Sequence, residues 1–183
     1  MNVTFGTLLR LFVLVLAVVV FQIAVVSQLN VFDANADLLP LVALSIGLLA
    51  GPVAGATVGF LLGLVADMAL LQTLGVTSLL LIGVGYLAGR YRELRDATHK
   101  MVPPLGGLVA TLAYAAAFSL VQFLLGVESP VSPLVIREIV AGALINALLA
   151  IPVFAAVRAF LRPDLIDDLR PRRRPVTRLR VTT

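Results

Sequence analysis

Residues 37–90 carry the strongest structural signal of the chain and read DLLPLVALSIGLLAGPVAGATVGFLLGLVADMALLQTLGVTSLLLIGVGYLAGR. The only charged residue between Leu38 and Gly89 is Asp67. It is the next step of four after glycines that recur at every fourth position: Gly47, Gly51, Gly55, Gly59 and Gly63. Because glycine has no Cβ, such spacing lets another backbone approach an apolar helix closely. Each step of four drifts about 40° around the helix, so this glycine face is broad enough for more than one neighbour.

The composition predicts an all-α polytopic membrane protein. Of 183 residues, 60% are hydrophobic and only 13% are charged, whereas about half is usual for the apolar share of a soluble domain. The apolar runs are continuous, so a transmembrane barrel with period-2 alternation is excluded. We expect one helical transmembrane domain over residues 1–162 and a basic cytoplasmic tail over residues 163–183.

The apolar runs divide into six expected spans, at about residues 11–29, 34–50, 52–71, 75–90, 104–125 and 133–161. Gly51 and Pro52 suit the end of one helix and the first turn of the next. Residues 38–50 rise only about 20 Å, against a hydrocarbon core of about 30 Å. Either this helix begins earlier, near Ala34, or it does not cross fully, and a re-entrant hairpin over 38–71 would give the same charge pattern. The first run exceeds the usual core of a signal peptide, so we interpret it as a span.

The distribution of charge predicts the orientation. With six spans, 13 of the 14 basic residues fall on one side, in the segment around Arg10, in the loop from Arg90 to Lys100 and from Arg158 onward. The loops on the other side hold acidic residues and no Lys or Arg. By the positive-inside rule, both termini are cytoplasmic and the protein lies in the membrane as a multi-pass chain.

Four polar residues inside the expected spans are candidate sites. Asp67 suits either a proton or cation relay or a structural hydrogen-bond acceptor, and the second is favoured because it lies close to a turn. Arg137 could pair with Asp67 across helices, while Glu138 suits a helix N-terminus, or both could reach the surface. Asn146 lies mid-membrane and needs a partner, which favours a hydrogen bond between helices.

The basic tail and the missing residue types limit the chemistry. The tail cluster predicts binding to anionic lipid, with a protein partner as the alternative: Arg172, Arg173, Arg174, Arg178 and Arg180. The basic residues flank spans, so nucleic acid is not an expected partner. There is no cysteine, the single histidine His99 lacks companion ligands, and no glycine-lysine phosphate loop occurs. We therefore expect no cofactor, no metal and no catalytic site.

Residues 35–92 resemble the MreD family, the rod-shape-determining membrane proteins of bacteria. The resemblance rests on the entry Asp37-Leu38-Leu39, although Ala36 stands where that family more often has proline. It continues through the Gly51-Pro52 break, the glycine-rich helix with Asp67, and the Leu74-Gly75 turn. It ends with Gly85-Tyr86-Leu87 before arginines.

The resemblance implies a non-enzymatic scaffold of the cell-elongation complex in the bacterial inner membrane, supporting lateral peptidoglycan synthesis. Its implied partners are an MreC-like bitopic protein, a RodA-type polymerase, a class B penicillin-binding protein and, directly or indirectly, an MreB-like filament. The implied fold is similar to the substrate-binding subunits of energy-coupling-factor vitamin transporters. That similarity supplies the alternative function, a small-molecule uptake subunit. Such a subunit needs its intramembrane polar residues to converge on a cavity. A scaffold would instead use the glycine face and the break, Gly51, Pro52, Gly55, Gly59 and Gly63, for packing within the chain or against a partner.

Overall fold

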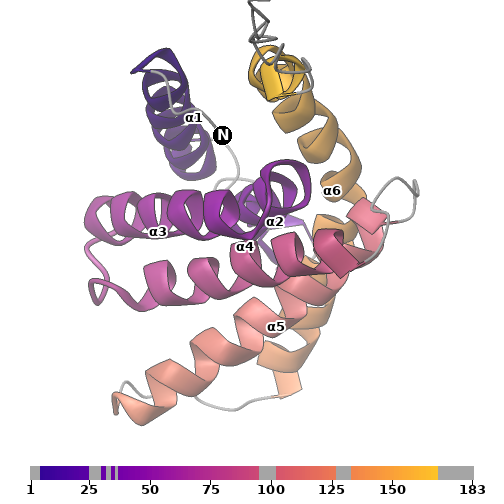
Figure 1. Ribbon diagram of the computed structural model, residues 1–183. Helices are drawn as coiled ribbons and strands as arrows, with labels where there is room; N and C mark the ends of the chain where they lie inside the picture. Colours follow the sequence, from indigo (N-terminus) through magenta and orange to yellow (C-terminus); the bar gives the residue numbers. More distant parts are fainter. Residues whose placement is uncertain are drawn as a thin grey trace, which may run out of the picture.

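The computed structural model describes residues 5–24, 30–31, 34–35, 37–94, 102–126 and 133–168, and these form six helices and one short strand pair (Figure 1). The helices are α1 (Phe5–Ala24), α2 (Leu38–Ala50), α3 (Pro52–Ala69), α4 (Val76–Leu94), α5 (Val102–Leu124) and α6 (Pro133–Asp168). The strands β1 (Asn30–Val31) and β2 (Ala34–Asn35) pair antiparallel. The predicted all-helical fold class with six helices is confirmed.

The short helix α2 is the centre of the molecule. It contacts each of the other five helices, and all its residues from Leu38 to Leu48 are buried. The helices α3 and α4 run side by side as an antiparallel hairpin against α2, and α5 and α6 form a second hairpin on the opposite side (Figure 1). The helix α1 packs across α3 and α2 through Leu14, Val15 and Val19. Every surface of α2 is therefore covered by protein.

Among the residues that the structure describes, three helices are long and apolar enough to cross a membrane: α3, α5 from Pro103 and α6 over Ile139–Leu161. The apolar part of α1, Arg10–Ala24, and the whole of α2 are shorter. The helix α4 carries Arg90, Arg92 and Glu93 in its last turns, which shortens its uncharged part. The membrane character predicted from composition agrees with these helices.

Several helices begin or end at residues other than the limits of the expected spans. The expected span 34–50 begins instead at Leu38, because the Asp37 carboxylate accepts a hydrogen bond from the Leu39 N–H and caps the helix there. The expected span 11–29 begins at Phe5, since helix geometry continues through the polar residues around Arg10. The last helix runs to Asp168, so part of the segment predicted as tail is helical. Hydropathy identifies the apolar residues of a helix but not the residues at which its hydrogen bonding begins and ends. The limits of the helices therefore differ from those of the apolar runs.

The break between α2 and α3 follows the predicted chemistry. Gly51 has φ 97°, a left-handed conformation that favours glycine, and its N–H donates to the Gly47 carbonyl at 2.9 Å. Pro52 occupies the first turn of α3, where its missing N–H costs no hydrogen bond. The two helices therefore meet with no intervening loop.

Candidate functional site

The glycine face of α3 lies against the backbone of α4. A Cβ on Gly59 would fall on the Leu81 carbonyl, and a Cβ on Gly63 would fall on the Ser78 backbone. A Cβ on Gly55 would meet the Gly85 carbonyl. Because backbone atoms cannot rotate aside as side chains do, each of these positions requires glycine for the two helices to stay this close.

Three helices meet at one glycine junction, formed by Gly47 of α2, Gly55 of α3 and Gly85 of α4. A Cβ on Gly47 or Gly55 would meet the Gly85 carbonyl, and one on Gly85 would meet the Gly55 carbonyl. Gly89 continues the contact, because a Cβ there would fall on Pro52. The face predicted to pack inside the chain or against a partner is thus occupied within the chain by α4 and α2.

Gly83 lies on the same helix as Gly85 but takes no part in this packing. A Cβ built on Gly83 meets no atom within 4 Å, so the position is open. Glycine spacing in α4 therefore marks a close contact at Gly85 and Gly89 only.

None of the first four backbone positions at the N-terminus of α2 has an unpaired N–H group. The first four N–H groups of a helix have no partner within the helix. Here the Asp37 N–H donates to Asn146 Oδ1 at 3.0 Å, the Leu38 N–H to Gln22 Oε1 at 2.9 Å and the Leu39 N–H to Asp37 Oδ1 at 2.9 Å. The fourth position is Pro40, which has no N–H.

Asn146 of α6 joins three helices at this end of α2. Its Nδ2 donates to the Asp37 carbonyl at 2.8 Å and to Thr111 Oγ1 of α5 at 3.0 Å, while its Oδ1 accepts from the Asp37 N–H. The side chain is 0% exposed. An amide buried this deeply must find partners inside the protein, and both of its ends do so. The side chain is a structural link between α2, α5 and α6.

The other end of α2 is held from α4. Arg92 Nη1 donates to the Leu49 carbonyl at 2.6 Å, which is one of the carbonyls that the end of a helix leaves without a partner. A cation there also suits the negative end of the helix dipole. Both ends of α2 are therefore bound by side chains from other helices.

Asp67 is 1% exposed and braces the turn between α3 and α4. Its Oδ2 accepts from the Gly75 N–H at 2.7 Å, and its backbone carbonyl accepts from the Gln72 N–H at 3.1 Å. Asp67 Oδ1 and the hydroxyl of Ser78, both buried, have no hydrogen-bond partner among the described residues. The geometry gives Asp67 the role of a backbone acceptor at the turn.

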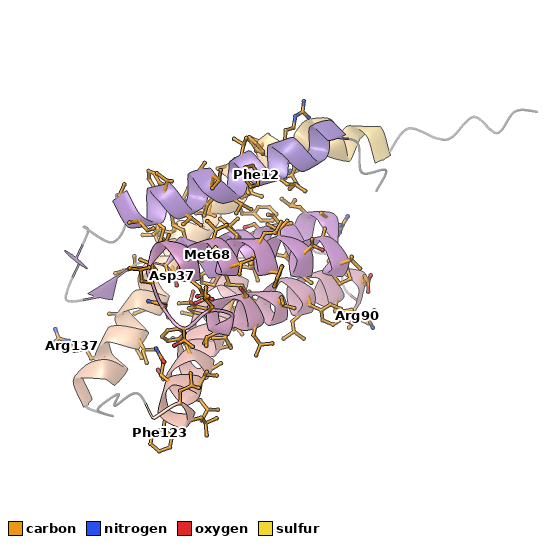
Figure 2. The ribbon with its side chains drawn as sticks, turned by 90° about the vertical axis from the view of Figure 1, so that its left-hand side faces the viewer. Phe12, Asp37, Met68, Arg90, Phe123 and Arg137 are labelled. Atoms are coloured by element: carbon orange, nitrogen blue, oxygen red, sulfur yellow. The ribbon has the colours of Figure 1, made fainter. Side chains whose placement is uncertain are left out.

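The remaining candidate residues lie apart from these contacts. The side chain of Arg137 is exposed, at the far side of the molecule from Arg90 (Figure 2), and the hypothesised pair with Asp67 is absent from the ion pairs of the described residues. The side chain of Glu138 and the tail arginines Arg172, Arg173, Arg174, Arg178 and Arg180 lie outside the described residues. Among the described residues, Arg137 and Asp67 therefore do not form the hypothesised pair.

The polar contacts described so far join helices to one another or close a turn. Over the described residues, no group of three or more His, Cys, Asp or Glu side chains is placed to hold a metal ion. Ser45, buried in α2, donates its hydroxyl to the Leu41 carbonyl at 2.7 Å, which is a bond within its own helix.

Comparison with known proteins identifies the family. Residues 2–163, most of the chain, match the family described as rod shape-determining protein MreD. The chain belongs to the MreD family. No curated protein and no solved structure matches it. The resemblance inferred from the glycine-rich segment is thus confirmed, and this MreD chain is a rod-shape-determining membrane protein.

Sequence reasoning assigned Asn146 to a bond between helices but did not identify the N-terminus of α2 as its target. Asp37 entered only as the start of the family resemblance. The structure brings both of them, with Gln22 and Thr111, to the N-terminus of α2. The sequence does contain a pattern that relates Gln22 to Asn146. Gln22 lies as many residues after Arg10 as Asn146 lies before Arg158. Equal intervals from the basic end place the two side chains at the same depth.

Proposed function

We propose that this protein is a non-enzymatic scaffold of the bacterial cell-elongation complex that binds an MreC-like single-span protein and supports lateral peptidoglycan synthesis. The RodA-type polymerase, the class B penicillin-binding protein and the MreB-like filament are further members of the proposed assembly. Membership of the rod-shape-determining family supports this proposal. The observation that carries it is the use of the intramembrane polar groups: Asn146 and Asp67 each bond backbone within the chain.

The alternative of a small-molecule uptake subunit is not favoured by the same observation. A ligand site needs polar side chains that converge and keep free hydrogen-bonding capacity for the ligand. Asn146 spends its amide on Asp37 and Thr111, and Arg137 is exposed elsewhere. Asp67 gives one carboxylate oxygen to the turn at Gly75, so its other oxygen and the nearby Ser78 hydroxyl are the unpaired polar atoms that the alternative would have to use. We therefore propose packing and partner binding as the function, without catalysis.

The proposed orientation places the protein in the inner membrane with both termini in the cytoplasm. The exposed Arg10, Arg90, Arg92 and Arg158 mark one end of α1, α4 and α6, and the positive-inside rule assigns that end to the cytoplasm. Binding of the basic tail to anionic lipid would add to this anchoring.

Because α4 and α2 occupy the glycine face, the proposed contacts with an MreC-like span fall on exposed helix faces. The test is photocrosslinking in native membrane, with a crosslinking amino acid placed singly at Phe12 of α1, Leu87 of α4, Val109 of α5 and Leu148 of α6. All four side chains are more than half exposed. We expect at least one position to capture an MreC-like polypeptide, identified by mass spectrometry.

The matched control is the same substitution at Leu62, which is 0% exposed in α3. It should capture no other polypeptide. Absence of an MreC-like polypeptide at every exposed position, together with normal rod shape in cells lacking the protein, would contradict the proposed function.

A further inference from the structure

The interior holds a second group of polar side chains, contributed by α3, α4 and α5. Asp67 of α3 and the α4 residues Thr77 and Ser78 are at most 3% exposed. The Tyr114 hydroxyl of α5 is hydrogen-bonded to the Thr77 side chain. The carboxylates of Asp37 and Asp67 both act electrostatically on that hydroxyl. Because Asp37 caps α2, this second group lies beside the polar junction at the N-terminus of α2.

Two oxygen atoms of this group have no hydrogen-bond partner among the described residues, Asp67 Oδ1 and Ser78 Oγ. Both belong to the same contact between α3 and α4. Asp67 Oδ2 accepts from the Gly75 N–H at 2.7 Å, three residues before Ser78. Gly63, one turn before Asp67 on the same face of α3, lies against the Ser78 backbone. Side chains of a helix tilt toward its N-terminus, so the Asp67 carboxylate leans back toward Ser78.

The two atoms need the same kind of partner. A buried polar atom without a hydrogen bond is costly, and the cost is greater for a carboxylate than for a hydroxyl. An ionised carboxylate oxygen accepts only, whereas a hydroxyl both donates and accepts. A water molecule has two donors and two acceptors, so a single water between Asp67 Oδ1 and Ser78 Oγ satisfies both atoms.

The position of Asp67 favours a neutral occupant over a cation. Its carboxylate lies beside Gly75 at the N-terminus of α4, where the helix dipole is positive. This end of α4 stabilises the carboxylate and repels a positive ion. None of the ion pairs of the described residues includes Asp67. A calcium ion takes about six to eight oxygen ligands, and over the described residues no three acidic, His or Cys side chains gather to hold a metal.

We propose that a water molecule is bound between α3 and α4, donating one hydrogen to Asp67 Oδ1 and accepting a hydrogen bond from Ser78 Oγ. The bound water adds a polar link to the glycine contact of the two helices. It completes a buried polar layer to which each helix, or its cap, contributes a side chain: Gln22, Asp37, Asp67, Ser78, Tyr114 and Asn146. The site does not depend on the proposed scaffold function or on the proposed orientation.

The first test compares unfolding temperatures of the full chain in detergent. Ser78→Ala removes only Oγ, so the backbone packing against Gly63 is kept. With the bound water in place, the variant should unfold about 2 to 4 °C below the wild type, because the water loses one of its partners. An unchanged or higher unfolding temperature would overturn the bound water, since removing a hydroxyl that has no partner relieves an unfavourable burial.

The second test asks whether Ser78 acts through Asp67. In the Asp67→Ala background, Ser78→Ala should lower the unfolding temperature by less than half of its effect in the wild type. Ser45→Ala is the matched control, because the buried Ser45 hydroxyl donates to the Leu41 carbonyl of its own helix. It should have the same effect in both backgrounds. Strictly additive effects of the Asp67 and Ser78 substitutions would contradict the bridge.

A crystal structure of the unsubstituted chain, at a resolution that shows ordered water, identifies the occupant directly. We expect a density peak about 2.7 to 3.2 Å from both Asp67 Oδ1 and Ser78 Oγ. Crystals grown in rubidium chloride should show no anomalous signal at that peak. An anomalous signal would identify a cation, and density for a larger molecule would indicate the ligand of an uptake subunit. Either result, or a direct hydrogen bond between the two side chains, would overturn the bound water. The crosslinking experiment can fail without changing any of these results.

Discussion

The two halves of the molecule are built on different principles. The half formed by α2, α3 and α4 packs backbone on backbone through Gly47, Gly55 and Gly85, and 39% of the apolar window of α3 is buried. In the half formed by α5 and α6, only 17% of the apolar stretch of α5 and 22% of that of α6 are buried. Large side chains such as Leu120 and Leu148 are exposed there. Lipid solvates leucine as well as protein does, so exposed leucines do not drive helices together in a membrane.

The comparison shows that the contacts that stabilise the fold and the surfaces available to lipid or another protein lie in different halves of the molecule. Close approach and satisfied hydrogen bonds stabilise the α2–α4 half, and both are sensitive to single atoms. The exposed faces of α5 and α6 tolerate change and are free for lipid or a protein span. Substitutions should therefore have steeply different effects in the two halves.

The largest expected effect comes from the glycine junction. Gly85→Ala should lower stability by about 3 kcal/mol, because its Cβ would collide with the Gly55 carbonyl and force α3 away from α4. The measurement is the loss of monodisperse protein on heating in detergent, followed by the fluorescence of a fused reporter. Gly83→Ala, two positions away with open space around it, is the matched control and should be neutral or slightly stabilising. Equal losses in the two variants would contradict the junction.

A smaller, graded effect is expected at the N-terminus of α2. Asn146→Leu should cost about 2 kcal/mol, because it leaves the Asp37 N–H without its acceptor and removes the amide donor to the Asp37 carbonyl. Gln22→Leu removes the acceptor of the Leu38 N–H and should cost about 1 to 2 kcal/mol. Thr111→Val should cost less, since the Asn146 amide keeps its bond to Asp37. The same heating assay measures the three variants. A larger loss of stability in Thr111→Val than in Asn146→Leu would contradict the hydrogen bonds described at the N-terminus of α2.

The smallest effect is expected on the exposed face of α6. Leu148→Ala removes a side chain that is 74% exposed and should change stability by less than about 0.5 kcal/mol. Leu41→Ala in α2, where the side chain is 0% exposed, is the internal comparison and leaves a cavity. If the two variants unfolded at the same temperature, the contrast between the halves would not hold.

The sequence predicted the helical class, the break at Gly51 and Pro52, and the close packing of the glycine face, because these follow from local residue chemistry. It left open what the face packs against, since both a neighbouring helix and a partner would need the same glycines. The pairing of Asn146 with Asp37 spans 109 positions and depends on how α6 crosses α2. No local pattern contains that crossing.

The role of Asp67 was predicted only in general terms. The sequence favours a structural acceptor and offers Arg137 as its partner, yet the partner is the Gly75 N–H. Every residue except proline carries a backbone N–H, so residue types alone do not single out Gly75 as the donor. The strand pair β1–β2 also escaped prediction, because two-residue strands leave no periodicity.

The dependence of α2 on Asn146 has a consequence for biosynthesis. A chain enters the membrane from its N-terminus, so α2 is made long before the residue that completes its cap. Until α6 arrives, the Asp37 N–H lacks the acceptor that Asn146 supplies. Folding of α2 is therefore completed only when α6 has been synthesised. A polypeptide that ends before Asn146 would remain incompletely folded and open to cellular proteases.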